Sequence, residues 1–117
     1  MTNRSKAKGT RWESELRDYL ISLGFEARRE ALKGNKDEGD IFGIDDWTLE
    51  AKNEKRIALA KYMDELAVEM KNGGTTHGAV LVKRARKSVG NAYAVMPLFD
   101  LLYLISELRQ LREKPIS

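Results

Sequence analysis

The chain has 117 residues, enough for one compact domain and too few for two domains of ordinary size. Its composition, 42% hydrophobic and 33% charged, is typical of a soluble globular protein, and a cytoplasmic location is expected by default. There is no apolar run of the roughly 20 residues that a membrane span needs, no apolar N-terminal secretion signal, and no cysteine for disulfides or thiolate metal ligation. The formal net charge of +3 is too small to indicate a nucleic-acid-binding protein, so only the distribution of charge is informative.

The first helix is expected over residues 11–23. Its apolar positions recur at the spacing of one helical face, namely Trp12, Leu16, Tyr19, Leu20 and Leu23. Thr10 and Glu13 fit a capping box at its start, and Gly24 provides a stop. Residues 1–9 are then expected to form a flexible basic arm ahead of the domain.

Three strands are expected next. Residues 25–30 alternate in part between apolar and charged side chains, and two further short strands are predicted over residues 40–44 and 47–53. These two runs are separated by Asp45-Asp46 and are expected to pair as a hairpin. The polar, glycine-bracketed segment before the hairpin indicates a loop.

The second half of the chain adds a helix, two strands and a last helix. Apolar residues mark one face of a helix over residues 57–71, namely Leu59, Met63, Leu66, Ala67 and Met70. Residues 79–82 read as a buried strand, residues 92–96 as a weaker one, and a leucine-rich helix is expected over residues 98–111 after Pro97. The order αβββαββα predicts one α/β domain with a central, mixed five-stranded sheet flanked by helices.

Three charged residues fall in or beside the expected hairpin. Asp40 begins it, and Glu50 and Lys52 share one face of its second strand because strand side chains alternate. A Glu–Lys pair alone can be a structural ion pair. Asp40 adds an excess negative charge, which a bound divalent cation satisfies better than packing does.

This interpretation makes a geometric demand on the hairpin. A regular two-residue turn at Asp45-Asp46 would place Asp40 and Glu50 on opposite faces of the sheet. A connection of odd length, or a bulge accommodated by Gly43, would place them together. We expect such an irregularity, because a regular hairpin would contradict a metal site.

Three segments carry a recognisable pattern in order along the chain: Lys8-Gly9-Thr10-Arg11-Trp12-Glu13, Gly39-Asp40-Ile41 and Leu49-Glu50-Ala51-Lys52. They resemble the opening helix, the metal-binding aspartate segment and the (D/E)xK strand of the PD-(D/E)xK nuclease superfamily, and within it the archaeal-type Holliday junction resolvases. Two departures are that Gly39 stands where a proline is usual and that the loop before it lacks a serine. The resemblance implies a restriction-endonuclease-like fold.

The resemblance also implies an activity, the hydrolysis of DNA phosphodiesters by a homodimeric resolvase of four-way junctions. Asp40 and Glu50 would ligate Mg²⁺, for which Mn²⁺ can substitute, with the Ala51 carbonyl as a third ligand. Glu13 would reach the same site directly or through water, although its capping-box role is an equal alternative. Lys52 would orient or help deprotonate the attacking water and offset charge on the phosphate. The expected catalytic set is therefore Glu13, Asp40, Glu50 and Lys52.

Basic residues are concentrated in two acid-free segments, residues 1–11 and 83–91, while the rest of the chain carries 13 basic and 18 acidic residues. One such segment is ordinary solvated charge, but two beside an acidic site favour a polyanion such as DNA. The residues expected to contact DNA are Lys6, Lys8, Arg11, Arg28, Arg29, Lys33, Lys36, Lys55, Arg56, Lys83, Arg84, Arg86 and Lys87.

Two other functions remain open at this point. One is a nuclease of the same superfamily that acts on flaps, forks or nicks, and the other is a non-catalytic DNA-binding module whose acidic cluster is a structural ion-pair network. The only histidine, His77, is expected to serve the turn before the strand over residues 79–82. The apolar face of the last helix is larger than so short a chain needs, which favours a helix-mediated homodimer; its residues are Leu98, Leu101, Leu102, Ile105 and Leu108.

Overall fold

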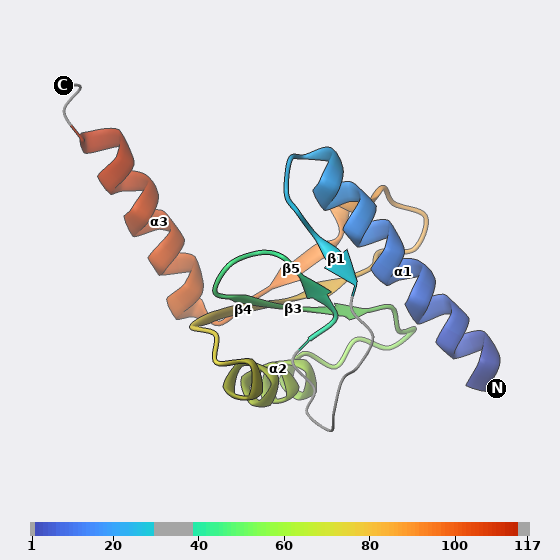
Figure 1. The fold of residues 1–117 in the computed structure, drawn as a ribbon. Helices are drawn as coiled ribbons and strands as arrows, with labels where there is room; N and C mark the ends of the chain where they lie inside the picture. Colours follow the sequence, from blue (N-terminus) through green and yellow to red (C-terminus); the bar gives the residue numbers. More distant parts are fainter. Residues whose placement is uncertain (1, 30–38, 115–117) are drawn as a thin grey trace.

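Five strands form one mixed sheet, with a helix against each face and a third helix projecting away (Figure 1). The computed structural model describes residues 2–29 and 39–114. Its elements are α1 (Thr2–Ser22), β1 (Arg28–Arg29), β2 (Ile41–Phe42), β3 (Trp47–Lys52), α2 (Leu59–Gly73), β4 (His77–Val82), the 3₁₀ turn η1 (Val89–Asn91), β5 (Tyr93–Val95) and α3 (Leu98–Glu113). Within these ranges no helix is both long enough and apolar enough to cross a bilayer.

The strands lie in the order β1-β2-β3-β4-β5. The first three are antiparallel, β3 and β4 are parallel from Trp47↔His77 to Lys52↔Val82, and β5 is antiparallel to β4. Helix α2 makes the crossover that a parallel pair requires. The predicted order αβββαββα and the mixed five-stranded sheet are therefore confirmed.

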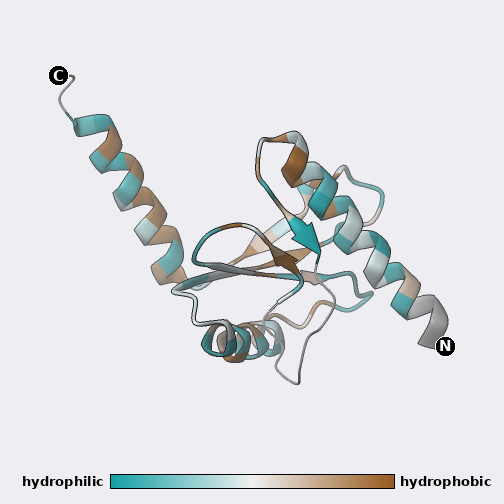
Figure 2. Cartoon of the chain, viewed as in Figure 1, coloured by the Kyte–Doolittle hydropathy of each residue, from teal (hydrophilic) through white to brown (hydrophobic). Residues whose placement is uncertain are grey.

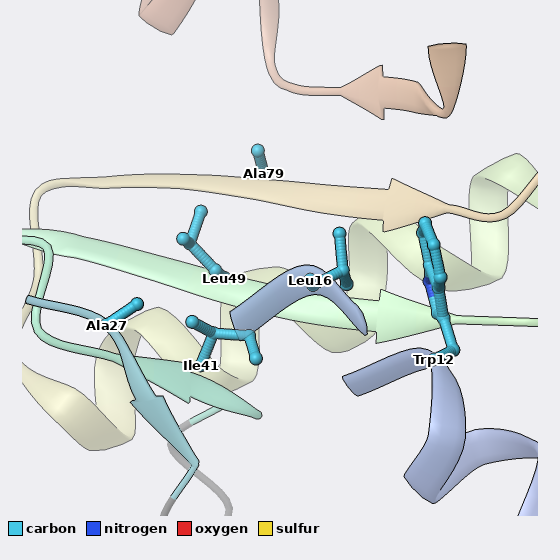
Figure 3. Packing of buried hydrophobic residues seen from close by; sticks show 6 residues of the cluster. All are labelled: Trp12, Leu16, Ala27, Ile41, Leu49 and Ala79. Atoms are coloured by element: carbon cyan, nitrogen blue, oxygen red, sulfur yellow. The ribbon is translucent and has the colours of Figure 1, made fainter. Parts of the chain in front are cut away.

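Alternation along the central strands divides the core into two parts. Leu49 and Ala79 face α1, in a cluster drawn in Figure 3 that consists of Trp12, Leu16, Ala27, Ile41, Leu49 and Ala79. Val80 and Val82 face α2 and pack with Tyr62 and Leu66. The indole N–H of Trp12 donates to the Leu81 carbonyl at 3.0 Å, which ties α1 to the centre of the sheet.

Helix α1 begins at Thr2, much earlier than the expected start near Arg11. Residues 2–9, expected to be a flexible arm, are its first turns. Thr10 therefore lies inside the helix, where its side chain cannot cap an N-terminus, and the capping-box explanation of Glu13 is wrong. A Ser/Thr-x-x-Glu pattern stops marking a helix start when the residues before it, here Lys6, Ala7 and Lys8, are themselves good helix formers.

Helix α2 buries a different stripe from the one that its apolar residues predicted. Tyr62, Leu66 and Glu69 are buried, whereas Leu59 and Ala67, which were assigned to the buried face, are exposed. The Tyr62 hydroxyl donates to a carboxylate oxygen of Glu54 at 2.6 Å, so its polar end is satisfied while its ring packs on the sheet. The buried stripe thus carries polar groups at its ends, next to the charged end of β3.

Candidate active site

The hairpin of β2 and β3 places Asp40 beside Glu50. Ile41 pairs with Leu49, so the residues on either side of that pair, Asp40 and Glu50, face each other. The Asp40 N–H donates to the Leu49 carbonyl at 2.9 Å, which keeps Asp40 bonded to β3 just before β2 begins. Side chains opposite each other on an antiparallel pair lie on the same face of the sheet. The two carboxylates are therefore together, as a metal site requires.

This register depends on one extra residue on the β2 side of the hairpin, between Ile41 and Ile44. At the turn, the Trp47 N–H donates to the Ile44 carbonyl at 3.2 Å, which is the bond of a two-residue turn. Counted from this turn, the regular partner of Ile41 would be Glu50, whereas Ile41 pairs with Leu49, so the register shifts by one residue. Gly43 adopts a φ of 105°, and a Cβ on it would lie 2.0 Å from the Glu26 carbonyl oxygen. The predicted irregularity at Gly43 is thus confirmed, and only glycine fits it.

Glu50 is a buried carboxylate in a site of like charge. Only 7% of the surface of Glu50 is exposed to solvent. Burial, together with the carboxylates of Asp40 and Glu69, raises the pKa of Glu50 to about 11. Its Oε1 is buried without a hydrogen-bond partner in the described part of the chain. The site therefore holds a proton on Glu50 at neutral pH unless a cation takes the proton's place.

The backbone of Ala51 faces the same edge. Its N–H donates to Oδ2 of Asp40 at 2.9 Å. Because the N–H and C=O of one strand residue point to the same side, the Ala51 carbonyl also points toward Asp40. The next residue points the other way, since the Lys52 carbonyl accepts from the Lys83 N–H at 2.9 Å. Asp40 and the Ala51 carbonyl thus meet at the edge of β3 that lies just beyond β2.

Lys52 lies on the same face as Glu50, as its spacing predicted. Its Nζ is 2.9 Å from a carboxylate oxygen of Glu65 and 3.8 Å from Oε2 of Glu50. Burial lowers the pKa of Lys52, but the hydrogen bond to Glu65 and the charge of Glu50 outweigh burial and raise it above its usual value. Lys52 is therefore an ammonium group at neutral pH, held by the Glu65 carboxylate and close to Glu50.

Two members of this cluster, Glu65 and Glu69, were not predicted from the sequence. Both come from α2, and Glu69 is only 4% exposed. Together with Tyr62 and Leu66 they occupy one helical stripe, with spacings of three and four residues. The prediction of the buried face of α2 used apolar residues alone and therefore missed this stripe. Its pattern of large apolar residues alternating with acidic ones, in a helix that follows an acidic strand, could have indicated it.

Glu13 pairs with Arg29 in the neighbourhood of Asp40. Both Nε and Nη2 of Arg29 lie 3.1 Å from Oε1 of Glu13, and Arg29 also donates to the Ser14 hydroxyl at 3.3 Å. Burial and the nearby Asp40 raise the pKa of Glu13, against the opposing effect of Arg29. In the described residues no three His, Cys, Asp or Glu side chains are already arranged to hold a metal ion together.

A groove of about 460 Å³ opens beside the end of β3 and gathers five of the expected DNA contacts. It is lined by Lys8 of α1, Lys55 after β3, and Lys83, Arg84 and Lys87 after β4. Asn53 and Glu54, which directly follow Lys52, line it as well, so the groove begins where the candidate site ends. Segments far apart in the sequence thus form one basic surface.

Two of these basic side chains have partners within the fold. Lys83 contacts Glu15 at 3.1 Å and lies over the Trp12 ring, 4.8 Å from its centroid. Arg84 donates to the Asn91 carbonyl at 3.3 Å and stacks on Tyr93. For Lys8, Lys55 and Lys87 the described residues supply no acidic partner within ion-pair distance, which leaves their charges directed to solvent in the groove.

The other expected DNA contacts are not all in this groove. Lys6, Arg11, Arg56 and Arg86 are exposed outside its lining. Arg28 lines a separate hollow beside the turn at Asp45-Asp46, and Arg29 is engaged by Glu13. Lys33 and Lys36 lie outside the described residues.

No protein-family model, curated protein or solved structure matches this chain. Functional inference therefore rests on the geometry of the site. That geometry joins a paired carboxylate site, an ammonium group two residues along the same strand, and a basic groove that starts at the next residue.

Proposed function

We propose that this protein is a magnesium-dependent DNA endonuclease with a restriction-endonuclease-like fold, and that it resolves four-way junctions. One observation carries the proposal: the bulged register sets Asp40 opposite Glu50, with Lys52 on the same face of β3. A regular hairpin would have separated the two carboxylates. A bulge that re-aims a side chain is a feature typical of functional sites.

The donor set suits a hard divalent cation. Mg²⁺ is commonly held by one or two carboxylates, completed by water and substrate phosphate, so Asp40 and Glu50 with the Ala51 carbonyl are a sufficient protein contribution. The buried Oε1 of Glu50, which has no donor among the described residues, would be satisfied by a cation. When bound, Mg²⁺ or Mn²⁺ would stabilise charge on the phosphate and lower the pKa of a water.

The remaining side chains suit phosphodiester hydrolysis. Because its pKa is raised, Lys52 would act as a cation that orients water and offsets negative charge on the phosphate, rather than as a base. The 2.9 Å contact with Glu65 would fix the direction of its Nζ. Glu13 would act at the margin of the site, where Arg29 holds it.

DNA is the substrate class that suits the surroundings of the site. Lys8, Lys55 and Lys87 would contact the phosphate backbone along the groove, in a way that gives affinity without reading sequence. The preference for four-way junctions follows from the resemblance to resolvases. Two symmetric cuts require two sites, so this proposal includes a homodimer.

One observation favours a second function, a non-catalytic DNA-binding module. Lys52 is already paired with Glu65 at 2.9 Å, as in a structural ion-pair network. Against this, Lys52 is the one ammonium group that the described residues place against Glu50 and Glu65, while Asp40 sets a further carboxylate against Glu50. Buried ion pairs of that imbalance add little stability, so the nuclease is the better explanation.

The deciding experiment compares DNA substrates under one set of conditions. Purified protein is incubated with about 5 mM MgCl₂ or MnCl₂ and an end-labelled four-way junction, a flap or a linear duplex. Paired, symmetric nicks on the junction alone are expected. The Asp40→Ala variant should bind but not cut, while Asp45→Ala, which removes an exposed carboxylate of the same hairpin, should cut normally.

Other outcomes would separate the alternatives. Equal cutting of flaps or linear duplex would indicate a nuclease with another structural preference. Intact DNA in every reaction, at enzyme concentrations that saturate binding, would reject the nuclease and leave the DNA-binding module.

A further inference from the structure

Helix α3 projects away from the sheet, and its root is fixed to the domain (Figure 1). One carboxylate oxygen of the buried Asp100 pairs with Nδ1 of His77, and the other accepts the Gly78 N–H at 3.1 Å. The His77 ring also stacks on Tyr103, with centroids 4.2 Å apart. His77 therefore orients α3, a role beyond the turn that the sequence suggested. Figure 2 shows hydrophobic residues along the projecting helix. The expectation that helices flank the sheet holds for α1 and α2 and fails for α3.

An apolar groove of about 800 Å³ lies between the root of α3 and β5, the last strand of the sheet. Its principal lining residues are Ile57, Leu59, Tyr93, Val95, Leu98 and Leu101. Binding sites for small ligands have volumes of about 300–1,000 Å³, so the groove is large enough for one. Because the Asp100 anchor fixes the first turn of α3, the wall that α3 contributes has a defined position.

Backbone groups at the open edge of β5 add polar atoms to this groove. The Lys83 N–H bonds to the Lys52 carbonyl, so the peptide groups of the preceding residue, Val82, point toward β5. Tyr93 pairs with Val82 and therefore points its own peptide groups at β4. The N–H and C=O of the next residue, Ala94, then point to the open edge, where the described residues place no further strand. Ala94 lines the groove.

Tyr93 connects the apolar groove to the basic groove at the end of β3. Both Tyr93 and Ile57 line the two grooves. Tyr93 is 47% exposed, and the guanidinium carbon of Arg84 lies over its ring, 5.0 Å from the centroid. Arg84 lines the basic groove and not the apolar one. An exposed aromatic ring on a strand, with a cation beside it, is the kind of platform on which nucleobases stack.

We propose that this surface binds an unpaired nucleobase of DNA, which stacks on Tyr93 and enters the apolar groove while its phosphate lies in the basic groove. This inference rests on the DNA binding of the proposed function. A nucleobase has flat faces and a polar edge, which match the apolar walls and the free N–H and C=O of Ala94. A paired base has its edge and both faces occupied within the duplex, so only an unpaired base can enter.

Such a site would favour branched DNA over plain duplex, because strands that separate at a branch expose unpaired bases. An apolar segment of another protein would suit the apolar groove alone. It would not explain why that groove shares Tyr93 and Ile57 with a surface of five basic side chains. The charge of the adjoining groove therefore selects a nucleotide as the occupant.

The test measures DNA affinity by fluorescence anisotropy in EDTA, so that the result does not depend on metal or on cleavage. The probes are labelled duplexes of about 25 base pairs with the same sequence: one fully paired, one with a bulge of about three thymines, and one with abasic sites in that bulge. The wild type should bind the thymine bulge at least about 5-fold more tightly than either other probe. Salt should weaken all three alike and leave this ratio unchanged, because stacking releases no counterions.

Variants separate the aromatic ring from its surroundings. Tyr93→Leu keeps an apolar side chain without the aromatic face, so it should lose the preference for the bulge while its affinity for paired DNA changes little. Tyr93→Phe should keep the preference. The matched control Phe99→Ala removes an exposed ring that lines neither groove and should behave as wild type. Lys55→Gln should weaken binding to all three probes and leave the ratio unchanged.

The outcomes distinguish this inference from the proposed function. Equal wild-type affinity for the thymine bulge and the paired duplex would overturn the inference and leave the nuclease proposal standing. The same conclusion would follow if the abasic bulge bound as tightly as the thymine bulge, or if Tyr93→Leu kept the preference. No binding to any probe at about 10 μM protein would overturn both.

Discussion

Replacing Glu50 by Gln should remove most of the pH dependence of stability near neutral pH. Burial and the carboxylates of Asp40 and Glu69 raise the pKa of Glu50 to about 11, from an ordinary value of 4.5. The folded protein therefore keeps a proton on Glu50 that the unfolded chain releases above about pH 4.5. A raised folded-state pKa means that stability is greatest at low pH and falls as the pH rises through this window.

The slope follows from the difference of one bound proton. Each pH unit between the two pKa values costs about 1.4 kcal/mol of unfolding free energy, or about 4 kcal/mol from pH 5 to pH 8. Total stabilities of such domains are about 5–15 kcal/mol, so the loss is a large fraction. The raised pKa of Glu13 acts in the same direction. The lowered pKa of Asp46 acts at more acid pH and does not obscure the effect.

The assay is urea unfolding with EDTA across about pH 5 to 8, followed by circular dichroism. Glu50→Gln retains the shape of the protonated side chain, and its amide can donate to Asp40. It should therefore match the wild type near pH 5 and exceed it by a few kcal/mol near pH 8. Adding Mg²⁺ at pH 8 should stabilise the wild type and leave Glu50→Gln nearly unchanged. The exposed control Asp45→Asn should behave as wild type.

Two results would refute this reasoning. A wild-type stability that is flat between about pH 5 and pH 8 would show that Glu50 ionises without cost, as an ordinary surface carboxylate does. Equal slopes in the wild type and in Glu50→Gln would assign the pH dependence to other groups.

Three further predictions concern the bulge, the ammonium group and the basic groove. Gly43→Ala should lower the free energy of unfolding by more than about 2 kcal/mol in urea, because the added Cβ would clash with the backbone of Glu26 and Ala27, just before β1. The control Gly24→Ala, also at positive φ but with open space around it, should cost only about 1 kcal/mol, and equal costs would argue against the clash. Lys52→Met should lower the cleavage rate at least about 100-fold while DNA affinity changes little, whereas the exposed control Lys61→Met should cut normally; unimpaired cutting by Lys52→Met would exclude its proposed role. Lys55→Gln should weaken DNA binding similarly for all sequences and reduce the slope of log affinity against log salt by about one, and an unchanged slope would place the DNA elsewhere.

The order of elements could be predicted from the sequence, because each helix or strand has its own periodicity of apolar residues and is bounded by turn or glycine residues. Alternation and the Asp45-Asp46 turn predicted the hairpin, and Asn72-Gly73-Gly74 marked the end of α2, which the structure closes at Gly74 in the left-handed conformation. The Asp40–Glu50 register was predicted from a functional requirement rather than from propensity. Propensity alone would have favoured the regular two-residue turn, and only the glycine at position 43 hinted at the bulge.

What the sequence could not supply depends on tertiary contacts. Apolar spacing predicted the wrong buried face for α2, because Tyr62 and Glu69 are buried although both have polar groups. Their burial is possible because these groups interact with Glu54 and Glu50, respectively. The direction of α3 depends on His77 and Asp100, which are 23 residues apart and whose pairing no local pattern announces. The apolar excess of the last helix was visible in advance, but its exposure was not.

The burial of Glu69 is better explained by function than by stability. Its neighbours on the buried stripe, Tyr62 and Leu66, pack with Val80 and Val82, so an apolar residue in its place would extend an existing core. A third carboxylate beside Asp40 and Glu50 instead raises the pKa of Glu50 and makes the cation-free site costly to ionise. The same charge increases the free energy that a cation gains on binding. Glu69→Leu should therefore reduce the stabilisation of the protein by Mg²⁺ at pH 8, and unfolding titrations with and without Mg²⁺ measure this difference. If Glu69→Leu left the Mg²⁺ response intact, Glu69 would be a structural residue.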